Sequence, residues 1–255
     1  MKKKLINGVY TIIDPEQGSN IFELTEKVIL GGVKIVQYRD KINSISKKII
    51  NSNKIKSICE KYNVLFIIND SADLAKEVDS DGVHIGQNDD TIEYCKKTLS
   101  DEKIIGTSNN NMEEIYQSIE AKIDYLAIGK IFETSTMGKK DRNIVGLKLI
   151  TDTKKITKIP IVAIGGINKD NANKVIKSGA DSICVVSEII KSANPELEAN
   201  SFKRFFNYEK KNLTIYQTLS VIGIFYQNPL AQIFSMLQQL KQEIYYSYQD
   251  MALNL

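Results

Sequence analysis

The chain has 255 residues, of which 42% are hydrophobic and 25% charged, and its formal net charge is +3. The length suits one (β/α)8 barrel of about 250 residues or two smaller domains. Its near-neutral charge and scattered basic residues argue against a nucleic-acid-binding protein. The sequence contains no run of about 18 apolar residues, the length that a membrane-spanning helix needs.

Short β-branched runs alternate with longer helical patterns along the chain. The runs predict strands at residues 9–13, 34–38, 64–68, 82–85, 103–106, 125–131, 161–164 and 182–186. Helices are predicted at residues 21–30, 44–61, 72–78, 91–99, 112–121, 145–156, 171–178 and 195–206. Several runs are apolar on both faces, which is typical of parallel strands covered by helices. Eight such units predict an α/β fold, a (β/α)8 TIM barrel over residues 1–206, with an open flavodoxin-like sheet as the alternative.

Polar side chains gather where the predicted strands end, and in a barrel the chemistry lies at the C-terminal ends of the strands. Gln37, Arg39 and Lys41 alternate along the second strand, so they share one face. An amide beside two cations suits a polyanion, because Arg and Lys both bind phosphate oxygens. The alternative is a solvated strand edge.

Asp70 and Asp89 end the third and fourth predicted strands. Neighbouring parallel strands lie about 5 Å apart, so the two carboxylates could share one hard cation. Mg²⁺ typically uses one or two carboxylates together with substrate phosphate oxygens and water. The alternatives are a helix N-cap for Asp70 and a turn role for Asp89.

Gly165 and Gly166 follow the seventh predicted strand, and Ser187 follows the eighth. The loops after strands seven and eight form the usual phosphate site of a barrel, and helix N-termini favour anions. Plain turn geometry is the alternative for the glycines. The loop of residues 134–141 is rich in hydroxyls and lysines, which favours either a lid over the substrate or an ordinary solvated loop.

His84 is the sole histidine and lies inside the fourth predicted strand, where we expect a packing residue with a satisfied hydrogen bond. A Ser-His-Asp triad would have to use this one residue, which the packing role disfavours. A His/Cys zinc site lacks ligands at the usual spacing. The cysteines, Cys59, Cys95 and Cys184, are far apart. They predict reduced, buried thiols in a cytoplasmic protein.

Motifs in a fixed order across residues 8–206 resemble the thiamine-phosphate synthase family. They are VQYRDK at 36–41, IIND at 67–70, DGVHIGQND at 81–89, TST at 134–136, AIGGI at 163–167 and GADS at 179–182. The resemblance implies a transferase that joins 4-amino-2-methyl-5-hydroxymethylpyrimidine diphosphate to hydroxyethylthiazole phosphate. Diphosphate would leave first, and the thiazole nitrogen would capture the pyrimidine cation.

The resemblance also assigns roles to residues of this chain. Arg39, Lys41, Ser108 and Lys139 would be catalytic, and Asp70 and Asp89 would bind one Mg²⁺ per site. The substrates would contact Gln37, Tyr38, Arg39, Asp40, Lys41, Asn69, Ser108, Thr134, Ser135, Thr136, Lys139, Gly166, Val186 and Ser187.

Two positions depart from the pattern of the family. Met137 and Gly138 separate Thr136 from the next lysine, so Lys139 or Lys140 would hold the diphosphate. Asn110 stands where members often have a histidine. That histidine is catalytic in a related thiazole tautomerase, so its absence here disfavours tautomerase activity. A thiazole tautomerase and a non-catalytic phosphate-metabolite sensor remain the alternative functions.

Residues 207–255 exceed what a barrel needs and match no part of the family. Apolar residues recur there at helical spacing after Pro229, which predicts a helical C-terminal extension. We expect it to pack on the barrel or to form a homo-oligomer. Membrane-surface binding is disfavoured, because this helix carries few Lys or Arg residues.

Overall fold

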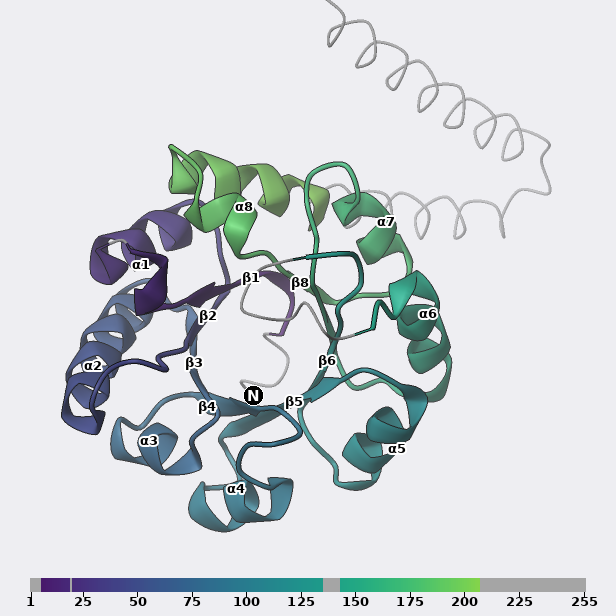
Figure 1. Ribbon diagram of the computed structural model, residues 1–255, viewed down its shortest axis with the longest axis horizontal. Helices are drawn as coiled ribbons and strands as arrows, with labels where there is room; N and C mark the ends of the chain where they lie inside the picture. Colours follow the sequence, from purple (N-terminus) through teal and green to yellow (C-terminus); the bar gives the residue numbers. More distant parts are fainter. Residues whose placement is uncertain (1–5, 19, 135–142, 207–255) are drawn as a thin grey trace, which may run out of the picture. The chain divides into compact units, whose positions relative to one another are not determined.

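The computed structural model describes residues 6–18, 20–134 and 143–206. In this part of the chain, eight parallel strands hydrogen-bond in sequential order and close into a barrel, with the helices as an outer ring (Figure 1). The predicted (β/α)8 barrel is therefore confirmed, and the open sheet is excluded because β1 pairs with β8. The predicted helical extension lies outside the described residues.

The elements follow the predicted alternation. The strands are β1 (Gly8–Ile13), β2 (Ile35–Tyr38), β3 (Leu65–Asn69), β4 (Gly82–Ile85), β5 (Ile104–Asn109), β6 (Tyr125–Ile128), β7 (Ile161–Ile164) and β8 (Ser182–Cys184). The helices are η2 (Pro15–Gln17), α1 (Ile21–Leu30), α2 (Ile45–Lys61), α3 (Ala72–Glu77), α4 (Ile92–Thr98), α5 (Met112–Glu120), α6 (Gly146–Ile156), α7 (Ala172–Lys177) and α8 (Ser187–Ile190). A further helix spans residues 195–206.

Two short helices, η2 and α8, were not predicted. They have three and four residues, so neither is long enough to show a helical period in the sequence. The 3-10 helix η2 is fixed instead by Asp14, whose side chain accepts a hydrogen bond from the Glu16 amide, and by Pro15 at its first position. The strand predicted at 182–186 ends at Cys184, which leaves room for α8 to begin at Ser187.

Capping side chains explain where many helices begin. Asn20, Ser44, Ser71, Thr91 and Asn111 each accept a hydrogen bond from a backbone N–H of the first turn of the helix that follows. Such caps satisfy N–H groups that have no partner within the helix. They fix the points at which the chain leaves the barrel mouth.

Two tyrosines fill the interior of the barrel below its mouth. Tyr10 on β1 and Tyr125 on β6 are buried, and their hydroxyls lie 3.2 Å apart across the barrel. Gly106 makes room for this, since a Cβ there would lie 2.0 Å from the Tyr125 ring. The floor of any cavity at the mouth is therefore aromatic and hydroxyl-bearing.

Within the described ranges, no helix is both long and apolar enough to span a bilayer.

Candidate active site

A cavity of about 260 Å³ opens at the C-terminal ends of the strands. Every strand of the barrel or the loop after it contributes to its lining, from Tyr10 on β1 to Cys184 on β8. This is the end at which barrel enzymes carry their chemistry. The lining brings together these predicted site residues: Gln37, Arg39, Lys41, Asn69, Asp70, Asp89 and Ser108.

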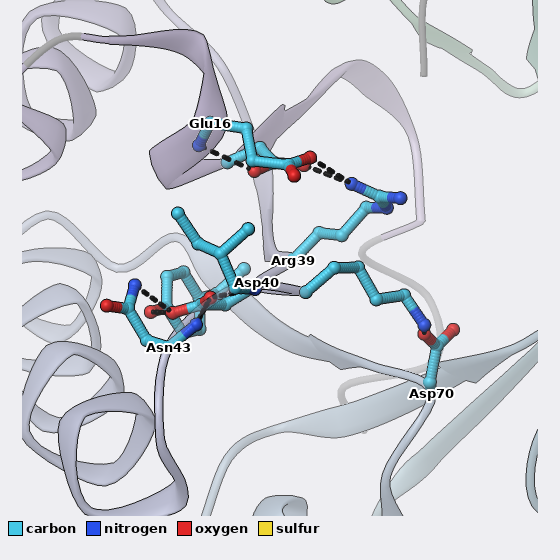
Figure 2. Close-up of polar contacts among 9 residues, drawn as sticks. Glu16, Arg39, Asp40, Asn43 and Asp70 are labelled. Atoms are coloured by element: carbon cyan, nitrogen blue, oxygen red, sulfur yellow. Dashed lines mark hydrogen bonds and ion pairs between the residues drawn. The ribbon is translucent and has the colours of Figure 1, made fainter. Parts of the chain in front are cut away.

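Arg39 is held at the cavity by a carboxylate. Its Nη1 donates to Oδ2 of Asp14, whose side chain is only 2% exposed, and it lies 3.7 Å from Oε2 of Glu16 (Figure 2). Asp14 thus caps η2 with one oxygen and holds the guanidinium with the other. Asp14 directly follows the first predicted strand, and only the structure shows what its carboxylate contacts.

Lys41 and the two predicted metal ligands form one cluster. Lys41 Nζ donates to Oδ2 of Asp70, and the Asp89 carboxyl lies within hydrogen-bonding reach of Asp70. Ser71, rather than Asp70, caps α3, so the N-cap alternative for Asp70 is wrong. Asp89 does have a turn role, since its Oδ2 accepts from the Gly86 amide at 2.7 Å.

The donor set at this cluster suits a hard cation. No group of three or more His, Cys, Asp or Glu side chains placed to hold a metal occurs in residues 6–18, 20–134 and 143–206, so a site made of protein ligands alone is not found there. Two adjacent carboxylates that leave the other coordination positions to phosphate oxygens and water match the coordination typical of Mg²⁺ in proteins. The pair is half-buried beside a cavity with cations on its rim.

Tyr38 and Asp40, two predicted substrate contacts, point away from the cavity. The Tyr38 hydroxyl donates to Asp40 at 2.5 Å and accepts from Asn51 of α2 at 3.0 Å. Asp40 also accepts from the backbone and side chain of Asn43, as Figure 2 shows. Because side chains alternate along a strand, residues 38 and 40 face the helices when 37, 39 and 41 face the barrel mouth. Their side chains shape the β2–α2 loop.

The remaining predicted residues follow β6, β7 and β8, three consecutive strands of the barrel. Gly166 has a φ of +64°, and a Cβ there would lie 2.5 Å from the Glu133 carbonyl oxygen. Tight packing therefore requires this glycine whether or not an anion binds beside it. The same packing brings the segment that leads into Thr134 against the β7–α7 turn, while Val186 and Ser187 lie at the start of α8.

Comparison with known proteins assigns this arrangement to a family. The family model for thiamine monophosphate synthase matches residues 9–189. The chain belongs to this family. The match covers most of the barrel, so it confirms the resemblance carried by the motifs, and nothing in the comparisons favours the tautomerase or the sensor.

Individual synthases support the same assignment. The thiamine-phosphate synthase of Persephonella marina is 39% identical over 189 residues, which cover 73% of this chain and 90% of that protein. The enzyme of Methanosarcina barkeri is 42% identical over 171 residues, covering 67% of this chain and 77% of that one. A synthase from Prochlorococcus marinus subsp. pastoris is longer: at 39% identity, this chain spans 54% of its length.

Among solved structures, thiamine phosphate pyrophosphorylase from Pyrococcus furiosus superposes with a TM-score of 0.74 and 30% identity. The match covers 80% of this chain and 98% of that one. A 3-hexulose-6-phosphate synthase, at 16% identity and a TM-score of 0.57, shares the barrel fold alone.

Part of the predicted synthase site lies outside the described residues. Ser135, Thr136 and Lys139, with the alternative Lys140, belong to that part of the chain. The segment before it holds a residue that the sequence did not single out. Lys130 is 2% exposed and lies 2.6 Å from Oε1 of Glu133, which lowers the pKa of that carboxyl. A lysine between Gly129 and Ile131 carries no sequence signal of burial.

The Asp70–Asp89 carboxylate pair gives a testable pH dependence. Burial, and then the neighbouring Asp89, raise the pKa of Asp70 above its usual value, although Lys41 opposes the shift. The folded protein therefore keeps a proton that the unfolded chain has already released. The free energy of unfolding should fall as pH rises from the ordinary carboxyl pKa through the raised one.

Asp70→Asn should remove this contribution to the fall of the unfolding free energy with pH. The variant should therefore gain stability relative to the parent as pH rises from 4 to 7. Urea unfolding of both proteins in EDTA at several pH values measures the effect. If the unfolding free energy of the two proteins changed equally with pH, the Asp70–Asp89 pair would not be strained in the absence of metal.

Proposed function

We propose that this barrel joins 4-amino-2-methyl-5-hydroxymethylpyrimidine diphosphate to hydroxyethylthiazole phosphate, giving thiamine phosphate and diphosphate. The family assignment sets the class of reaction. The observation that carries the proposal is the convergence of Arg39, Lys41 and the Asp70–Asp89 pair on one cavity at the barrel mouth.

The cationic side of the cavity would hold the diphosphate. In the reaction, the bond between the pyrimidine methylene carbon and the diphosphate oxygen breaks, and the oxygen keeps the electron pair. Charge on the leaving group grows toward the transition state, so Arg39, Lys41 and Lys139 would stabilise that state more than the bound substrate. Gln37, Asn69 and Ser108 would bind the same substrate with neutral groups.

Mg²⁺ would complete this half of the site, held by Asp70 and Asp89 as one ion per site. Both residues lie where the loops after β3 and β4 meet, and the pKa of Asp70 is raised by burial first and then by the neighbouring Asp89 carboxyl. When bound, the ion supplies positive charge to the leaving diphosphate. Lys41, which donates to Asp70, would then be free to turn toward the diphosphate oxygens.

The thiazole phosphate would lie on the opposite side of the mouth. Thr134, Ser135 and Thr136 would offer hydroxyls from the β6 loop. Gly166, Val186 and Ser187 would offer backbone N–H groups after β7 and β8, where barrels commonly bind phosphate. The thiazole nitrogen donates its lone pair to the pyrimidine cation. No proton has to be removed in this step, so the site needs no general base.

The setting of the enzyme is a further part of the proposal. All three cysteines are buried thiols outside any disulfide, which suits a reducing cytoplasm. A homo-oligomer through residues 207–255 stays a prediction.

A single assay tests the proposed reaction. Purified protein is mixed with both substrates and Mg²⁺, and thiamine phosphate and diphosphate are measured over time. We expect the two products in a 1:1 ratio and no product when Mg²⁺ is chelated. Isomerisation of the thiazole without diphosphate release would indicate a tautomerase, and binding of both substrates without turnover would indicate a sensor. Either result would overturn the proposal.

A further inference from the structure

A continuous chain of hydrogen bonds crosses the floor of the cavity from β2 to β5. Gln37 Nε2 donates to the Tyr10 hydroxyl at 2.7 Å, and that hydroxyl lies 3.2 Å from the hydroxyl of Tyr125. The Tyr125 hydroxyl lies 2.9 Å from His84 Nδ1, and His84 Nε2 lies 3.0 Å from Ser108 Oγ. The chain thus joins two predicted substrate-binding residues, Gln37 and Ser108, through buried side chains.

The chain has a preferred direction, because each hydroxyl carries one hydrogen. Gln37 donates to Tyr10, so the hydrogen of Tyr10 is free to go to Tyr125, and that of Tyr125 to His84 Nδ1. In the opposite direction, Tyr10 would accept from both Gln37 and Tyr125, and its own buried hydrogen would have no acceptor within this hydrogen-bond chain. Leaving a buried donor unpaired is costly.

The two tyrosines stay protonated at neutral pH. Burial raises the pKa of Tyr125 well above its usual value, and burial also raises the pKa of Tyr10. Both side chains therefore carry the hydroxyl hydrogen that the chain needs. A neutral His84 that accepts at Nδ1 has its single N–H at Nε2, which faces Ser108.

We propose that His84 is a positioning residue: the chain from Gln37 holds it as the neutral Nε2–H tautomer, its Nε2–H is donated to the Ser108 oxygen, and the Ser108 hydroxyl hydrogen is thereby directed into the cavity. This role rests on the proposed function, in which that hydrogen is donated to an oxygen of the departing diphosphate. With the opposite tautomer, Ser108 would donate to the ring and turn its lone pairs toward the anion, which would oppose the reaction.

The tautomer can be observed directly, because His84 is the only histidine in the chain. Two-bond ¹H–¹⁵N correlation spectra of untagged, ¹⁵N-histidine-labelled protein at pH 7.5 distinguish the two neutral tautomers and the imidazolium. We expect a protonated Nε2 and an unprotonated Nδ1. In Tyr125→Phe, which removes the donor to Nδ1, this preference should weaken. An Nδ1–H tautomer, an imidazolium, or an unchanged tautomer in Tyr125→Phe would overturn the proposal.

Kinetics test whether the tautomer acts through Ser108. Relative to the parent, His84→Asn, whose short amide does not reach Ser108, should lower kcat about tenfold or more with a smaller change in KM. His84→Gln, whose amide can replace Nε2–H, should recover most of that loss. In a Ser108→Ala background, the same His84 substitutions should lower kcat little further, because their effect depends on the Ser108 hydroxyl that is already absent. Fully additive losses, or no rescue by His84→Gln in a folded variant, would contradict the role.

The two experiments separate failure of this inference from failure of the proposed function. The NMR spectrum reads the tautomer whether or not thiamine phosphate is formed. Normal synthesis with an Nδ1–H tautomer would remove only the role of His84. An Nε2–H tautomer in a protein that releases no diphosphate would instead reject the reaction, and with it the purpose assigned to Ser108.

Discussion

Asp70→Asn should lower the turnover of thiamine phosphate by about 100- to 1,000-fold, the range typical when one group that stabilises transition-state charge is lost. The substitution is close to isosteric, and it removes the negative charge that would hold Mg²⁺ beside the diphosphate. Asn also tolerates the left-handed backbone of Asp70, which has a φ of +68°. A loss of turnover would therefore report on the carboxylate rather than on a misfolded loop.

Asp79→Asn is the matched control for this change. Asp79 also has a positive φ, of 49°, and it also pairs with a lysine, Lys103. It lies between α3 and the start of β4, at the end of the barrel opposite the cavity, and its side chain is 73% exposed. We expect turnover within about twofold of the parent, since exposed ion pairs contribute little. Initial rates over a Mg²⁺ titration compare the two variants, and near-normal rates for Asp70→Asn would reject its metal role.

Arg39→Ala should cause a loss of similar size, because it removes the guanidinium fork from the diphosphate side of the cavity. Arg39→Lys should retain only part of the activity, since an ammonium cannot reproduce the bidentate geometry of a guanidinium. Initial rates at saturating concentrations of both substrates measure the effect. Arg204→Ala, on the exposed face of the helix at 195–206, is the control and should leave the rate unchanged.

Stability has to be separated from catalysis at this position. Arg39 pairs with the buried Asp14, so Arg39→Ala leaves a carboxylate without its partner and should destabilise the fold by about 3 kcal/mol. The double variant Arg39→Met, Asp14→Asn removes both charges and should recover much of that stability while turnover stays low. If the double variant regained activity along with stability, the guanidinium would have only a structural role.

Much of the fold could be read from the sequence because its cause is local. Strands apolar on both faces and helices with capping residues such as Asn20 and Ser44 specify the βα units one at a time. The short helices η2 and α8 could not be predicted from the sequence, because each spans only about one turn. Part of the cavity lining could be predicted for the same reason: period-two alternation places Gln37, Arg39 and Lys41 on one face whatever the details of packing.

Contacts between distant strands could not be read in this way. Tyr10 and Tyr125 lie on β1 and β6, which do not pair, and their contact depends on how side chains of different size fill the closed barrel. The pairing of Arg39 with Asp14 likewise needs the path of the loop after β1. The resemblance assigns Tyr38 and Asp40 to the substrate because they lie within the motif, although alternation turns their side chains toward α2.

The proposed metal site at the barrel mouth is tested most directly by X-ray diffraction from crystals grown with Mn²⁺ and diphosphate. Anomalous scattering locates the ion without reference to activity. We expect one strong peak between the carboxylates of Asp70 and Asp89, with diphosphate oxygens in its coordination sphere and Arg39 on the diphosphate. A peak elsewhere, or diphosphate bound with no ion between the two aspartates, would contradict the proposed chemistry of the site.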